Sequence, residues 1–166
     1  MSKLFKISGN MMMDGKWSEP DPEFAGEIVV DEAGKFCGWC EKLADKKRGD
    51  IAKANWQFYL VGTMADENHG YSLQFLELSN VPWRPAVLFE IHTTSGADSI
   101  WSAKDPGGGF VPHGNARVDL EELEYSEEHA DSIKRRFRAV DININHNGEL
   151  IQAAHGWRKR TLVLWS

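Results

Sequence analysis

Cysteine is scarce in this chain of 166 residues, which contains only Cys37 and Cys40. A scaffold built on disulfides is therefore excluded. A chain of this length buries about 70% of its unfolded surface without such crosslinks. Two thiols outside a disulfide framework are typical of a reducing compartment, so the sequence predicts a cytoplasmic protein. The first residues lack the apolar run of about 7 or more residues that a secretion signal needs, and no membrane anchor is predicted.

Positively charged residues are outnumbered by negatively charged ones. Lysine and arginine total 19 against 25 aspartates and glutamates, which leaves a net charge of -6. Such a surface repels nucleic acid and anionic membranes, so neither is predicted as a partner. The densest basic run, at residues 134–138, follows an acidic tract and is interpreted as the solvated end of a helix. The predicted partner is a small-molecule ligand, and the sequence leaves the oligomeric state open.

Motifs for metals and phosphates are missing as well. The six histidines form no H-x-H, H-x-x-x-H or H-E-x-x-H pattern, and the chain has a single C-x-x-C. The glycine-rich stretch at residues 103–115 lacks both common phosphate-loop signatures, and no helical pattern follows it. The sequence therefore predicts no metal and no cofactor. The glycine-rich stretch is either a flexible rim over an opening or a plain connection.

Short strand-like segments fill most of the chain. Their alternation of side-chain character and their content of β-branched and aromatic residues are typical of antiparallel strands. Asp and Gly in the connection at residues 31–34 favour a tight hairpin there. A charged segment at residues 118–123 is interpreted as an exposed edge strand. The predicted strands lie at residues 24–30, 35–39, 55–64, 71–79, 85–94, 118–123, 140–145, 149–154 and 160–165.

One segment, at residues 126–140, has a helical period instead. Ala130, Ile133, Phe137 and Val140 recur at spacings of three and four and form one apolar stripe. Ser126 is a good N-cap, and the glutamates that follow it lie where the helix dipole favours anions. The sequence therefore predicts one late α-helix.

These elements together predict a single all-β domain covering residues 1–166. Its expected form is an up-and-down antiparallel β-barrel of roughly eight to ten strands with one late helix. A two-sheet β-sandwich is the alternative. In strand pattern the chain resembles the lipocalin-like and avidin-like (calycin-like) barrels, a likeness of shape that does not by itself assign a function.

The two cysteines lie in one predicted strand. Residues three apart in a strand point to opposite faces with Cα atoms about 10 Å apart, whereas a disulfide needs Cα atoms within about 7 Å. Structural thiols are therefore favoured for Cys37 and Cys40. A redox dithiol, which would need a turn at Gly38, and half of a metal site are the alternatives.

Glu90 and His92 are the candidate catalytic residues. They are two apart in a predicted strand and so share a face, opposite the apolar Val87, Phe89 and Ile91. On a water-facing surface this pair has no special role. In a barrel with a polar cavity, the carboxylate and the imidazole would serve as acid and base.

Tryptophan is unusually frequent, with seven residues in a small chain. Aromatic rings near strand ends either fill the ends of a wide barrel or line a ligand pocket. Trp101, Trp39 and His113 are the candidate ligand-binding residues, since they lie on or beside glycine-containing stretches. The function predicted first is binding of a small molecule, either an apolar compound or a sugar. An enzyme with a Glu/His pair and a protein-interaction module with a surface aromatic patch are the alternatives.

Overall fold

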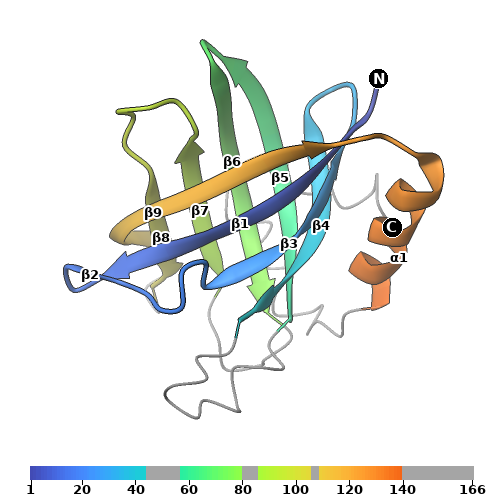
Figure 1. The fold of residues 1–166 in the computed structure, drawn as a ribbon. Helices are drawn as coiled ribbons and strands as arrows, with labels where there is room; N and C mark the ends of the chain where they lie inside the picture. Colours follow the sequence, from blue (N-terminus) through green and yellow to red (C-terminus); the bar gives the residue numbers. More distant parts are fainter. Residues whose placement is uncertain (44–56, 80–85, 106–108, 140–166) are drawn as a thin grey trace.

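The computed structural model describes residues 1–43, 57–79, 86–105 and 109–139. Within them the chain forms nine strands and one helix (Figure 1). The elements are β1 (Lys3–Met13), β2 (Lys16–Trp17), β3 (Phe24–Val30), β4 (Lys35–Lys42), β5 (Gln57–Glu67), β6 (Gly70–Ser79), β7 (Val87–His92), β8 (Ile100–Lys104), β9 (Phe110–Leu123) and α1 (Glu127–Ala139). The strands predicted at residues 140–165 lie outside the described residues.

The strands form one antiparallel sheet that closes on itself. Its order is β2-β1-β3-β4-β5-β6-β7-β8-β9, and a further antiparallel pairing joins β9 to β1. This pairing runs from Leu4 opposite Leu123 to Met11 opposite Ala116, and Figure 1 shows the two strands lying along each other. The prediction of a mostly antiparallel all-β fold is confirmed. The closed ring agrees in outline with the expected barrel rather than with two stacked sheets.

Strand β9 contains the segment predicted to be an edge. Residues 118–123 pair with β1 along one side, whereas β8 pairs only with residues 110–115, so within the described residues this segment has one partner strand. That partner, β1, was not among the predicted strands. Its sequence, KLFKISGNMMM, contains a Ser-Gly-Asn stretch that resembles a turn and interrupts the alternation. Asp119 and Glu121 lie on the outer face of β9, since Val118 and Leu120 face the interior.

The glycine-rich stretch is also mostly strand. Strand β8 continues to Lys104 and β9 begins at Phe110, so the expected long loop over residues 103–115 is wrong. Trp101 is opposite Gly114 and Ser102 is opposite Pro112, which makes His113 the extra residue of a β-bulge. A bulge accommodates Pro112, whose nitrogen cannot donate to the ladder.

Aromatic rings fill the middle of the ring of strands. Phe75 stacks on Phe89 with ring centroids 4.9 Å apart, and these two contact Phe36 and Phe24 at 5.8 and 6.1 Å respectively. They belong to one buried cluster built from the inward-facing residues of the strands. Small barrels have interiors just wide enough for side chains to fill, and the interior of this ring is filled by side chains in the same way.

Helix α1 covers part of the outside of the ring, beside β3 and β4 (Figure 1). Ala130, Ile133 and Phe137 are buried there in a second apolar cluster, and Phe137 meets Tyr59 edge-on at 4.5 Å. The N–H of His129 donates to Ser126 Oγ over 3.1 Å, as expected of an N-cap. The predicted helix and cap are confirmed, whereas Val140 lies outside the described residues.

The two cysteines occupy different clusters. Cys40 points into the interior, and Cys37 belongs to the outer cluster that α1 joins. Both are buried, and neither is in a disulfide. The prediction that they face opposite sides of a strand is confirmed, since β4 continues through Gly38 to Lys42 without a turn. In the described part of the chain, no helix has the length and apolar character needed to cross a membrane.

Candidate functional site

Glu90 and His92 share one face of β7, as the alternation of the strand indicated, and that face is on the outside of the ring. Val87, Phe89 and Ile91 face the interior, so Glu90 and His92 share the outer face of β7. Glu90 is exposed on that face. The carboxylate that contacts His92 is Glu67, at the end of β5.

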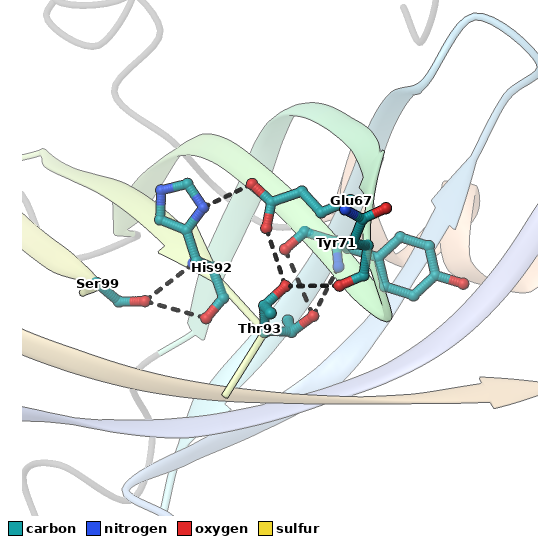
Figure 2. A network of polar contacts seen from close by, with 7 residues as sticks. Glu67, Tyr71, His92, Thr93 and Ser99 are labelled. Atoms are coloured by element: carbon teal, nitrogen blue, oxygen red, sulfur yellow. Dashed lines mark hydrogen bonds and ion pairs between the residues drawn. The ribbon is translucent and has the colours of Figure 1, made fainter. Parts of the chain in front are cut away.

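Glu67 and His92 form a close pair at one end of the ring (Figure 2). His92 Nδ1 lies 2.8 Å from Glu67 Oε1. Thr94 Oγ1 donates to the second carboxylate oxygen, Glu67 Oε2, over 3.2 Å. Both oxygens of Glu67 are therefore engaged.

The backbone around His92 is held by neighbouring side chains. The N–H of His92 donates to Ser99 Oγ over 2.9 Å, and Ser99 Oγ donates to the His92 carbonyl over 3.3 Å. On the neighbouring strand, the N–H of Tyr71 donates to Thr93 Oγ1 over 2.7 Å. Figure 2 shows these contacts side by side. The contact of Nδ1 with Glu67 gives the imidazole a defined direction.

Sequence reasoning missed Glu67 because it placed residues 65–70 in a loop. Strand β5 in fact continues to Glu67, and a tight turn at Asn68 and His69 leads into β6. His69 adopts a φ of 65°, the left-handed conformation typical of such turns. The Asn-His-Gly sequence was the available signal, since it resembles a two-residue hairpin turn. The hairpin and β7 then bring Glu67 to His92 across 25 positions of sequence.

An open depression surrounds this pair, and we call it the His92 depression. Its lining residues are Glu67, Asn68, His92, Thr94, Ala97 and Asp98. The side chain of His92 is 38% exposed and that of Glu67 is 28% exposed. A solute therefore has access to the imidazole, and the carboxylate is the less exposed of the two groups.

A second concave surface, the Trp39 groove, lies beside α1. It has a volume of about 330 Å³ and is lined by Lys6, Ala25, Gly26, Glu27, Trp39, Glu41 and Leu123. Two helical side chains reach its lining residues. His129 Nε2 contacts Glu27 Oε2, and the Arg136 guanidinium lies 3.4 Å above the Trp39 ring and 3.8 Å from Glu41.

The other two predicted ligand-binding residues contact each other instead. Trp101 is buried, with 4% of its surface exposed, and its indole N–H donates to the Met12 carbonyl over 2.9 Å. His113 stacks on the Trp101 ring at 5.1 Å. Strands β5, β6 and β7 lie between β4, which carries Trp39, and β8, which carries Trp101. Trp39 and Trp101 therefore belong to separate places on the molecule.

Neither surface has the donor set of a metal site. Among the described residues, no group of three or more His, Cys, Asp and Glu side chains is placed to hold an ion. Elsewhere, the Met1 ammonium donates a hydrogen bond to Glu32 over 2.9 Å, and this bond and the positive charge lower the pKa of the Glu32 carboxyl. That pair is exposed and touches neither surface.

Comparison of the chain with protein-family models, curated protein sequences and solved structures found no match in any of the three. The chemistry of the two surfaces is therefore the basis for assigning a function.

Proposed function

We propose that this protein binds a small organic molecule, an apolar compound or a sugar, in the Trp39 groove. The observation that carries the proposal is a partly exposed tryptophan in a groove of about 330 Å³. Ligand pockets are typically about 300–1,000 Å³ in volume, mostly apolar, and equipped with a few polar groups that orient the ligand. The groove lies at the lower end of that range.

The lining of the groove is divided between apolar and charged side chains. Ala25, Gly26, Trp39 and Leu123 supply the apolar part, and Lys6, Glu27 and Glu41 supply the charges. A flat ligand that removes about 100 Å² of apolar surface from water gains roughly 2.5 kcal/mol. Hydroxyl or amino groups on the ligand would then hydrogen-bond to the charged residues.

The packed interior supports an external site. Phe24, Phe36, Phe75 and Phe89 contact one another across the middle of the ring, and Trp101 is buried against Met12 and His113. A ligand on the barrel axis would have to displace these rings. The groove instead offers Trp39 without rearrangement of the core.

The test is a screen of indole- and phenyl-containing compounds and simple monosaccharides by tryptophan fluorescence and thermal shift. A ligand that binds only the folded state raises its stability by about 2.7 kcal/mol at 100 times its Kd, which corresponds to roughly 5–10 °C in Tm for a chain of this size. We expect Trp39→Ala to weaken binding at least tenfold, because its ring supplies the largest apolar surface of the groove.

Trp17→Ala is the matched control. Trp17 is also partly buried, and the Arg117 guanidinium lies 3.6 Å above its ring, just as Arg136 lies above Trp39. A ligand that loses affinity equally in Trp39→Ala and Trp17→Ala does not bind in the groove. The same holds for a ligand that loses affinity in neither variant. If no probe shifts either signal, the small-molecule proposal is contradicted. The interaction module, in which Trp39 contacts a protein partner, is then favoured.

A further inference from the structure

We infer that Glu67 and His92 form a carboxylate–histidine dyad that acts as a general base on an uncharged ester bound in the His92 depression. His92 Nε2 is the base, and Glu67 is the positioning residue. This activity goes beyond ligand binding in the Trp39 groove and uses a different surface, so either can fail without the other.

The contact with Glu67 decides which imidazole nitrogen of His92 holds the lone pair. Glu67 Oε1 lies 2.8 Å from His92 Nδ1, and an ionised carboxylate only accepts hydrogen bonds. Nδ1 therefore carries the hydrogen, and the lone pair of the neutral ring is on Nε2. Thr94 Oγ1 holds the other carboxylate oxygen, so Glu67 cannot rotate away without losing a second bond.

Hydrogen bonds also hold the backbone of His92 in place. Ser99 bonds to both backbone polar groups of His92. A catalytic group is effective when its orientation is fixed by supporting hydrogen bonds. His92 is supported in this way at its backbone and at its ring.

The His92 depression offers two polar groups to a bound ester and its attacking water. Within the described residues, His92 Nε2 and the Asn68 side-chain amide make no hydrogen bond, and both residues line the depression. Nε2 is therefore available to a water molecule, and the Asn68 amide can donate to a carbonyl oxygen. Glu67 and Asp98 add negative charge, which disfavours an anionic substrate.

The reaction that these groups support is hydrolysis. Nε2 removes a proton from water while the water oxygen bonds to the ester carbonyl carbon, and Glu67 stabilises the resulting imidazolium. The negative charge on the former carbonyl oxygen is met by the Asn68 amide. When the carbonyl re-forms, the bond to the alcohol oxygen breaks, and the imidazolium returns its proton to the departing alkoxide. The products are a carboxylic acid and an alcohol, with no change in oxidation state.

The test measures hydrolysis of p-nitrophenyl acetate and of a ring-carboxylated analogue. We expect saturable turnover of the neutral ester and at least tenfold lower kcat/KM for the anionic one. His92→Ala should lose at least 100-fold, since general-base catalysis contributes about 10²–10⁴-fold. Added imidazole should restore part of that loss. Glu67→Gln should lower kcat about tenfold or more with little change in KM. The uncharged amide still accepts the hydrogen bond from Nδ1, but it lacks the full negative charge that stabilises the imidazolium.

His69→Asn is the matched control, because His69 lies on the same hairpin, is exposed and does not line the depression. Asparagine tolerates the left-handed conformation found there. Activity that is non-saturable, or that is equal in wild type, His92→Ala and His69→Asn, overturns the inference. If His92→Ala does not fold, the test uses the His69→Asn protein instead, with His92 blocked by carbethoxylation. Turnover that survives complete modification of His92 overturns the inference equally.

Discussion

At the scale of single residues, the least ordinary feature is a buried ion pair between Glu23 and Lys42. Their side chains are 8% and 5% exposed, and Lys42 Nζ also lies 5.9 Å from the centroid of Phe58. Among the described residues, Glu23 Oε2 finds no hydrogen-bond partner. The carboxylate therefore depends heavily on the lysine for compensation of its charge.

Replacing Lys42 with methionine should destabilise the protein by about 3–5 kcal/mol, because the Glu23 carboxylate is left buried without its counter-charge. Urea unfolding followed by fluorescence measures this free energy. The double variant Glu23→Leu, Lys42→Met is the control. It should be more stable than Lys42→Met alone, since no charge remains buried. A single variant within 1 kcal/mol of wild type would mean that the pair is already solvated.

At the scale of elements, α1 depends on one apolar stripe. Phe137 is buried against Tyr59 on the outside of the ring, whereas Arg135, two residues earlier, is exposed. Phe137→Ala should cost about 3–5 kcal/mol, because it removes a buried aromatic ring and leaves a cavity. Arg135→Ala on the opposite face should stay within about 0.5 kcal/mol of wild type. Thermal and urea unfolding compare the two, and a loss below about 1 kcal/mol for Phe137→Ala contradicts the packing.

At the scale of the whole molecule, one sheet separates two apolar clusters, and each contains one thiol. Cys37 belongs to the cluster that α1 joins, and Cys40 belongs to the interior of the ring. Detachment of a single helix requires less free energy than opening a closed sheet, since local openings span a range up to the global value. Reaction of the Cys37 thiol therefore reports detachment of α1, and reaction of the Cys40 thiol reports opening of the ring of strands.

Cys37 should accordingly react faster than Cys40 with a thiol reagent under native conditions. The single variants Cys37→Ala and Cys40→Ala each leave one reporter, and Phe137→Ala added to either should accelerate labelling of Cys37 most. Labelling with a chromogenic disulfide reagent measures both rates. Equal rates in every background would show that helix and ring open only together.

The sequence by itself determined what is local in this protein. Alternation in residues 87–92 indicated that Val87, Phe89 and Ile91 form the core face, and the stripe with Ser126 before it located α1. The opposite directions of Cys37 and Cys40 follow from the same rule. Each of these features depends on the period of a strand or a helix, which neighbouring residues encode.

Only the tertiary structure decided which distant segments meet. Closure of the ring pairs β1 with β9, which gives the segment expected at an edge a partner strand that the sequence did not indicate. The same closure buries Trp101 against Met12, 89 positions away, and leaves Trp39 beside a groove. His92 likewise found its carboxylate in Glu67 and not in Glu90, its neighbour in sequence. Neighbouring side chains on one strand point to opposite faces, and alternate ones point the same way without converging. Functional groups therefore meet across strands, and which ones meet depends on strand register and hairpin length, which are properties of the closed sheet.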